Sequence, residues 1–420
     1  MNQPSDSPGS VEQSRELAEA VARRSYGKLV AFLAARTRDV AAAEDALSEA
    51  FASALTDWPR NGCPANPEGW LMTVARRKII DATRHGYVGV EVSRQLQIFS
   101  EGLSNDDATL PIPDRRLALM FACAHPAIDA SIHAPLILQV VLGLDATAIA
   151  SAFLTSPVAM SKRLVRAKEK IHQAGIPFNI PEREQLASRL DTVLDAIYAA
   201  FTEGWTDPGA TDVARRELTN EALFLARLLR ELLPNEPEAL GLLALMLHAE
   251  ARRRARRNER GEYVPLAQQD QQLWDFQKIL EAETLLRQAS ALGSIGRYQI
   301  EAALQSAHVY RCRTGIDNWP EVVHLYDALL NVSNSPVVVI NRALAIAETH
   351  GPAAALDSLK QVASDPRLAQ YQPYWAARAA LLARRGSAHE AFQAYEIAIG
   401  LERDDAVRRF LQQHQSKLSL

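Results

Sequence analysis

Hydrophobic residues recur every three or four positions along most of this chain, which is the spacing of amphipathic α-helices. The first such segment places Leu17 and Leu33 on one face. A second segment follows Asp39, and we expect it to end at Trp58–Pro59. A third starts near Pro67, in whose first turn a proline is tolerated. Because alternating, strand-like patterns are few, the sequence predicts an all-α fold.

Breaks in this pattern divide the chain into three helical parts. Glycine, proline, serine and asparagine gather between the parts, as they do in loops and linkers. The expected boundaries are a disordered lead-in at 1–11, a helical domain at 12–86, a linker at 87–113, a helical domain at 114–173, a proline-rich hinge at 174–184 and a C-terminal helical domain at 185–420.

Two short helices joined by a tight break lie between Thr147 and Ile171. Ser156 and Pro157 suit the N-cap and first position of the second helix. One face of that helix is apolar and the other is basic. The pattern indicates a helix-turn-helix that reads DNA, although an ordinary helical hairpin with a solvated basic face fits the same residues. Most helix-turn-helix turns have glycine where this chain has Leu154.

Composition and the motifs present limit the functions that this protein can have. The net charge of the 420 residues is −4, so any affinity for DNA must come from local basic patches. Three scattered cysteines favour a reducing cytoplasm without disulfides or a zinc site. We find no signal peptide, membrane span, catalytic set or phosphate-binding loop. We therefore expect a cytoplasmic protein that is not an enzyme and uses no cofactor or metal.

The C-terminal part repeats a helical pattern. In the segment Gly386–Ala406, Ala391, Tyr395 and Ala398 occupy the packing positions of the second helix of a tetratricopeptide repeat. Tyr326 takes a similar place in an earlier unit. Spacings near 34 residues are typical of this class, in which each helix pair buries its face against its neighbours. We predict a tetratricopeptide-like domain, and an irregular helical bundle is the alternative.

Three motifs in order carry a resemblance to a known family. They are AEDALSEAF from Ala43, NPEGWLMTVARRKIIDATRH from Asn66 and SKRLVRAKEKI from Ser161. Together they resemble regions two and four of bacterial sigma factors of the extracytoplasmic-function type. AGIPFNIP from Ala174, followed by a long helical extension, resembles the subgroup with a C-terminal tetratricopeptide-like domain. The resemblance implies a protein that recruits core RNA polymerase to promoter DNA and initiates transcription.

The resemblance also implies roles for particular residues. Glu44, Asp45 and Glu49 would dock on the clamp helices of the polymerase β′ subunit, and region four would meet the β flap. In the loop before the third helix, Asn61 and Asn66 are candidates for a pocket that holds unstacked bases of the minus-ten element. Trp70 is more typical of a core residue. The basic residues expected to contact the DNA backbone are Arg76, Arg77, Lys78 and Arg84, together with His85.

The second helix of the helix-turn-helix would read the minus-thirty-five element. Side chains that can bond or contact base edges in the major groove are Ser161, Lys162, Val165 and Arg166. Arg163 and Lys168 would hold phosphates, which fixes position without reading sequence.

Other readings of the whole chain remain open. A conventional helix-turn-helix regulator that binds operators and carries a helical sensor domain would not need the acidic AEDALSEAF helix. A tetratricopeptide scaffold would not bind DNA. We expect the C-terminal helical domain to have a regulatory role. Its partner would be an unidentified peptide, a small molecule or polymerase. The basic run Arg252–Arg257 is typical of a solvated face, and FTEGW and DQQLWDF are typical of packing segments.

Overall fold

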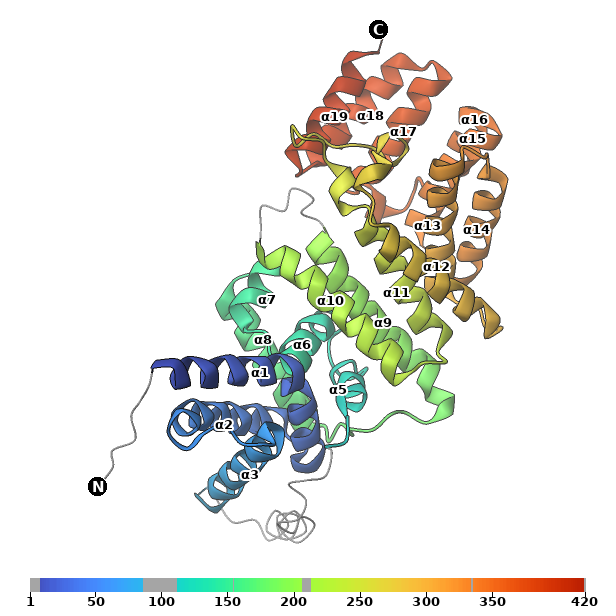
Figure 1. Cartoon of the computed structure of the whole chain (residues 1–420). Coiled ribbons are helices and arrows are strands. Elements are labelled where there is room, and N and C mark those ends of the chain that lie inside the picture. Colours follow the sequence, from blue (N-terminus) through green and yellow to red (C-terminus); the bar gives the residue numbers. More distant parts are fainter. Residues whose placement is uncertain (1–7, 86–111, 154, 206–212, 334, 419–420) are drawn as a thin grey trace, which may run out of the picture. The chain divides into compact units, whose positions relative to one another are not determined.

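The computed structural model describes residues 8–85, 112–153, 155–205, 213–333 and 335–418. In these ranges the chain is helical and contains no strands, and a single bridge joins Arg257 to Tyr263. The predicted all-α fold is therefore confirmed (Figure 1). The chain forms two compact units, one of residues 1–205 with 213–222 and the other of residues 206–212 with 223–420.

The first unit begins with three helices. They are α1 (Pro8–Thr37), α2 (Val40–Asn61) and α3 (Pro67–His85). Because α1 starts at Pro8, the expected disordered lead-in is wrong for residues 8–11, and residues 1–7 lie outside the described residues. Asp39 caps α2 by accepting a hydrogen bond from the amide of Ala42, at 3.0 Å. Capping at Asp39 and the start of α3 at Pro67 agree with the sequence pattern.

The second helix does not stop at Trp58–Pro59 as expected. It continues through Pro59 to Asn61 and closes where the Gly62 amide donates to the Trp58 carbonyl, at 3.0 Å. Proline removes one backbone hydrogen bond from a helix, but Trp58 is fully buried in the core of the unit. Tertiary packing of that ring therefore outweighs the local signal of the proline.

A second set of helices belongs to the same unit. It comprises α5 (Arg116–Cys123), α6 (Ala130–Leu142), α7 (Ala146–Ala152) and α8 (Pro157–Gln173). Ser156 accepts a hydrogen bond from the Ala159 amide at 3.2 Å, which confirms the predicted N-cap with proline at the first position. Leu154 in the turn and residues 86–111 of the expected linker lie outside the described residues.

The two sets of helices pack directly against each other. At Gly27 the backbone of α1 lies so close to α6 that an added Cβ would be 1.9 Å from the Val141 carbonyl oxygen. Nearby, the ring of Tyr26 covers Gly143, whose backbone is left-handed at φ 74°. Residues on both sides of the expected linker therefore share one packed body. A mid-helix glycine such as Gly27 is the sequence signal of such a close approach.

The expected C-terminal domain starts later than predicted. Helix α9 (Arg183–Trp205) belongs to the first unit, where it packs on α5 and α6. Arg189 donates to the Phe121 carbonyl at 2.7 Å and thereby ties α9 to α5. The boundary between the units falls within α10 (Val213–Leu232).

The second unit is a succession of helices, each of which packs against its neighbours in the chain (Figure 1). Ala391, Tyr395 and Ala398 are buried at the predicted packing positions. This arrangement is consistent with helical repeats. The helices are α11 (Pro237–Ala251), α12 (Phe276–Ala291), α13 (Arg297–Thr314), α14 (Trp319–Val332), α15 (Pro336–Thr349), α16 (Gly351–Lys360), α17 (Gln372–Arg385), α18 (Ala388–Leu401) and α19 (Asp405–Ser416), with short 3-10 turns at Arg253–Arg256, Leu266–Gln268, Gln271–Leu273 and Pro366–Leu368.

The basic run Arg252–Arg257 is not the solvated helix face that its charge indicates. It forms a 3-10 turn with Ala255 buried and most of its arginines half-buried. Arg257 pairs with Asp404, the N-cap of α19. In the neighbouring DQQLWDF segment Trp274 is buried, as expected of a packing residue.

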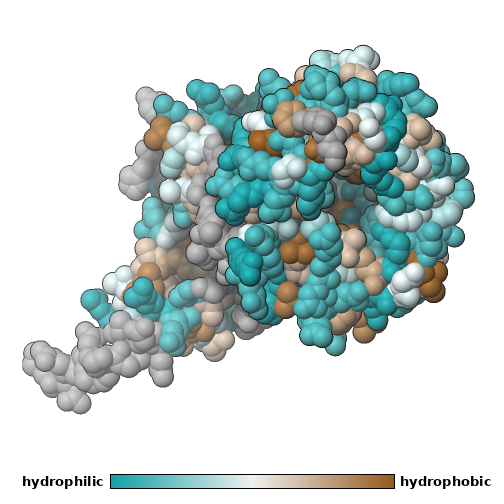
Figure 2. Space-filling model, turned by 90° about the horizontal axis from the view of Figure 1, so that it is seen from above, coloured by the Kyte–Doolittle hydropathy of each residue, from teal (hydrophilic) through white to brown (hydrophobic). Residues whose placement is uncertain are grey.

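The surface carries no large apolar belt on the face drawn in Figure 2, where hydrophobic residues are dispersed among hydrophilic ones. Among the residues that the structure describes, every helix is too short or too polar to span a bilayer.

Candidate nucleic-acid interface

Helix α8 presents a mixed polar and apolar face to solvent. Its buried stripe is the predicted one, formed by Met160, Leu164, Ala167 and Ile171. On the other side Ser161, Lys162 and Arg166 are exposed, and Val165 is 56% exposed. Val158, one turn earlier, is 65% exposed on the same face. Hydroxyl and cationic groups beside exposed methyl groups can bond base edges and contact thymine methyls in a major groove.

Arg163 fixes how α8 sits on its own helical set. Its guanidinium donates to the Ser131 hydroxyl at 2.7 Å and to the Ser131 carbonyl at 3.2 Å, at the start of α6. Asp129 caps α6 by accepting from the Ser131 amide at 2.8 Å, and these serine hydrogen bonds lower the pKa of Asp129. Arg163 therefore has protein partners in addition to its predicted role toward phosphates.

Lys168 joins α8 to α2. Its ammonium donates to Glu44 Oε2 at 2.7 Å, and only 14% of the Lys168 side chain and 10% of the Glu44 side chain are exposed. Burial raises the pKa of Glu44, while the charge of Lys168 and its hydrogen bond partly lower it. The expectation that Glu44 lies on an open acidic face is therefore wrong. Its partner is 124 residues away in the sequence, where no local pattern could reveal it.

The other two carboxylates of α2 are exposed, as predicted. Asp45 and Glu49 both face solvent. Lys78 of α3 forms an ion pair with Glu49, with its ammonium nitrogen 2.8 Å from Glu49 Oε2. The hydrogen bond in this pair raises the pKa of Lys78. An exposed pair of this kind contributes little to stability and exchanges easily for other partners. Lys78 is therefore available for a phosphate at little cost.

The basic end of α3 is partly described. Arg77 is exposed and Arg76 is half-buried. Arg84 and His85 belong to the helix, but their side chains lie outside the described residues. The two candidate asparagines flank the loop: the Asn61 amide donates to Asp57 at 2.7 Å, and Asn66 accepts from the Gly69 amide at 3.1 Å. Both side chains are exposed and help shape the loop ends.

An aromatic pair joins the two helices that flank this loop. Trp70 is half-buried and meets the buried ring of Trp58 edge to face, with centroids 5.6 Å apart. The prediction that Trp70 is a core residue is therefore met only in part, because its side chain is half-buried. The sequence pattern indicated Trp58 only as the end of the second helix, although a tryptophan before a loop at the end of an apolar stripe is also a signal of packing.

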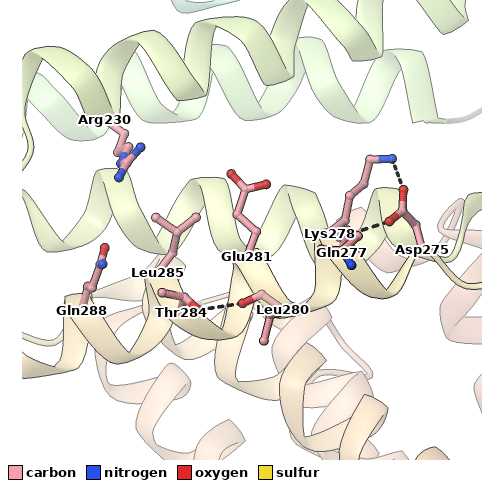
Figure 3. A pocket seen from close by; sticks show the side chains of 9 residues that line it. All are labelled: Arg230, Asp275, Gln277, Lys278, Leu280, Glu281, Thr284, Leu285 and Gln288. Atoms are coloured by element: carbon pink, nitrogen blue, oxygen red, sulfur yellow. Dashed lines mark hydrogen bonds and ion pairs between the residues drawn. The ribbon is translucent and has the colours of Figure 1, made fainter.

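The second unit contains a groove that no sequence pattern indicated. It has a volume of about 420 Å³ and lies against α12, with one wall residue, Arg230, from α10. Figure 3 shows its lining, in which Lys278 pairs with Asp275 at 2.5 Å. Glu281 pairs with Arg227 of α10. The lining combines ion pairs and amides with the exposed Leu280.

Basic groups also gather between α11 and α13. Burial lowers the pKa of His248 to about 4, of His308 to about 4 and of Arg252 to about 10. Arg252 donates to the His248 carbonyl at 3.1 Å, and Arg311 lies over the ring of Trp319 at 3.7 Å. Arg252 also donates to the side-chain oxygen of Gln305 in α13, and the Arg311–Trp319 contact joins α13 to α14. Within the described ranges, no cluster of three or more histidine, cysteine or carboxylate side chains could hold a metal ion.

Comparison of the sequence with known proteins places the chain in a family. Residues 21–86, which include all of α2 and α3, match sigma-70 region 2. Residues 189–290 match a family of unknown function, DUF6596. The chain is 38% identical over 375 residues to "Uncharacterized protein R00370" of Rhizobium meliloti (strain 1021), covering 87% of each chain. The chain belongs to the family of that protein. No solved structure matches.

The region 2 match makes this a sigma-factor-like protein. That family implies binding to core RNA polymerase and promoter DNA, and a role in transcription initiation. The acidic residues of α2 and the basic end of α3 both fall within the matched segment. Helices α7 and α8 and the second unit lie beyond it.

Proposed function

We propose that this protein is a cytoplasmic sigma factor of the extracytoplasmic-function type with a tetratricopeptide-like C-terminal domain. In this proposal α2 binds the clamp helices of polymerase, and α3 with its preceding loop binds the minus-ten element. Helix α8 reads the minus-thirty-five element, with its set of helices against the β flap. The observation that carries the proposal is a sigma-70 region 2 followed, in the same unit, by a capped helix with an exposed basic face.

The chemistry of α2 supports polymerase docking. Asp45 and Glu49 lie one helical turn apart on an exposed face, and a rigid pair of carboxylates suits a basic helical partner. The Lys78 pair with Glu49 is exposed at both ends, so a stronger cationic partner can displace it. Glu44 joins this surface only when its contact with Lys168 is broken.

The chemistry of α8 supports groove binding. Arg163 holds the helix on α6, which leaves Lys162 and Arg166 pointing away from the core. An anchored helix loses little conformational entropy on binding, so its exposed cations act as pre-positioned donors. Val165 between them supplies an apolar contact.

Charge reversal on α2 separates this proposal from an operator-binding regulator. The variant Asp45→Lys/Glu49→Lys should lose binding to core polymerase by tenfold or more, measured without DNA. Glu259→Lys/Glu396→Lys, at exposed positions of the second unit, makes the same change in net charge and should bind normally. Equal binding by both variants would contradict the polymerase-docking role of α2.

Footprinting tests the DNA roles. With core polymerase present, the wild-type chain should protect two elements of one promoter, and Lys162→Ala/Arg166→Ala should lose protection at the upstream element only. Lys170→Ala, an exposed lysine of the same helix outside the predicted set of base-contacting residues, is the matched control. Loss of both elements in the control, or of neither in the variant, would argue against α8 as the reading helix.

A further inference from the structure

Arg252, the C-cap residue of α11, is held by neutral groups. Its guanidinium donates to the His248 carbonyl at 3.1 Å and to the side-chain oxygen of Gln305 in α13. In the described part of the chain, no carboxylate forms an ion pair with Arg252. Burial lowers the pKa of Arg252 to about 10. Because burying a charge without an opposite charge costs free energy, this guanidinium favours the binding of a negative group.

Arg311, on the neighbouring helix α13, is also held by neutral groups. It donates to the side-chain oxygen of Asn318 at 3.0 Å and to His308 Nδ1 at 3.0 Å. Its guanidinium carbon lies 3.7 Å from the centre of the Trp319 ring. These contacts fix the orientation of the guanidinium but leave its positive charge without an opposite charge.

Two histidines lie beside these arginines. Burial, followed by the charge of Arg252, lowers the pKa of His248 to about 4, and burial, Arg311 and Arg252 lower the pKa of His308 to about 4. His248 is fully buried, and its two ring nitrogens have no hydrogen-bond partner among the described residues, although Nε2 lies 3.4 Å from Glu283 Oε1. The charges of both arginines act on His308, so both guanidiniums lie near one imidazole.

Carboxylates of the adjoining helices have other partners. Glu283 of α12 accepts a hydrogen bond from the Ser306 hydroxyl at 2.6 Å, and Glu301 of α13 pairs with Arg297 at 2.7 Å. Arg311 is half-buried rather than enclosed, so solvent reaches the cluster from its side. The cluster therefore combines uncompensated positive charge with access for a small anion.

We propose that Arg252 and Arg311 form a binding site in the second unit for a small oxyanion, the phosphate or carboxylate group of a soluble molecule. Guanidinium groups suit both anions because their planar donors match paired oxygens. Since Nδ1 of His308 accepts from Arg311, its Nε2 carries the proton and is a further donor for the anion. The inference does not rest on the proposed function, because these residues lie outside the region 2 match and α8.

Calorimetric titration of the full chain tests the site, with inorganic phosphate in one arm and malonate in the other, at low ionic strength. Wild type should bind at least one of them saturably, and the arm that binds distinguishes a phosphate from a carboxylate ligand. Arg252→Met/Arg311→Met should weaken that binding tenfold or more. Arg254→Met/Arg313→Met removes two exposed arginines nearby and should bind as wild type does. Binding of neither anion, or equal binding by both double variants, would overturn the site.

Hydrogen exchange separates a binding site from a purely structural clamp. Phosphate or malonate at about ten times its dissociation constant should slow exchange of α11 and α13 about tenfold in wild type and in Arg254→Met/Arg313→Met, but not in Arg252→Met/Arg311→Met. Without an anion, Arg252→Met should exchange no faster than wild type, because it removes a buried charge and keeps most of the side-chain volume. Faster exchange in Arg252→Met without an anion would indicate a clamp and contradict the proposal.

Discussion

Replacing Gly27 by alanine tests the packing of the first unit most sharply. Gly27 lies within α1, where an added Cβ would be 1.9 Å from the Val141 carbonyl oxygen and 2.8 Å from its carbon. Real Cβ atoms essentially never come within 3.0 Å of such atoms, so α1 or α6 must move by about 1 Å or more. The obstacle is backbone, which cannot rotate aside as a flexible side chain can.

Two opposing effects set the magnitude. Alanine stabilises a helix interior by up to about 1 kcal/mol relative to glycine. Overpacking a tight contact costs about 1–3 kcal/mol, and contacts with backbone belong at the upper end of that range. If α1 and α6 pack as the structure shows, Gly27→Ala should lower the free energy of unfolding of the first unit by about 1–2 kcal/mol. If they do not pack, the same change should raise it.

Hydrogen exchange of the full chain under native conditions shows whether Gly27→Ala raises or lowers the free energy of unfolding of the first unit. Peptides from α1 and α6 should exchange faster in Gly27→Ala than in wild type, and peptides from α17 and α18 should not change. Gly400→Ala is the control, because Gly400 lies in α18 with open space where a Cβ would be. It should be neutral or stabilising. Slower exchange of α1 in Gly27→Ala would refute the contact between the two sets of helices.

Three further outcomes follow from the structure. The pKa values of His248 and His308 fall from 6.5 to about 4, so the unfolded chain binds protons more readily below pH 6.5, and stability should fall as the pH drops from 6.5 toward 4. At pH 5 the loss is on the order of 2 kcal/mol per histidine, and urea denaturation of His308→Gln should show a shallower pH dependence than wild type. Ser156→Ala should cost about 1 kcal/mol through the lost N-cap, seen as faster exchange at the start of α8. Leu164→Ala should cost about 2–5 kcal/mol in thermal unfolding, whereas Val165→Ala should be nearly neutral.

Local patterns allowed the helices and the exposed face of α8 to be predicted. Capping by Asp39 and Ser156 and the buried stripe from Met160 to Ile171 depend only on neighbours within a few residues. Such signals are complete in the sequence itself. The same holds for the exposure of Asp45 and Glu49.

Features that depend on distant residues were not predictable. The burial of Glu44 requires Lys168, and the continuation of α2 past Pro59 requires the core around Trp58. Half-burial of the arginine run depends on partners such as Asp404, which caps the last helix. A charged residue looks exposed in sequence because burial is unfavourable without a partner, and the partner is set by the tertiary fold.

Transcription from purified components tests the central claim most directly. Core RNA polymerase would be incubated with sheared genomic DNA of the source organism, with and without the full chain, and transcript starts would be mapped. The account predicts discrete start sites that appear only with the chain and disappear with Asp45→Lys/Glu49→Lys. Identical start sites with and without the chain would contradict it.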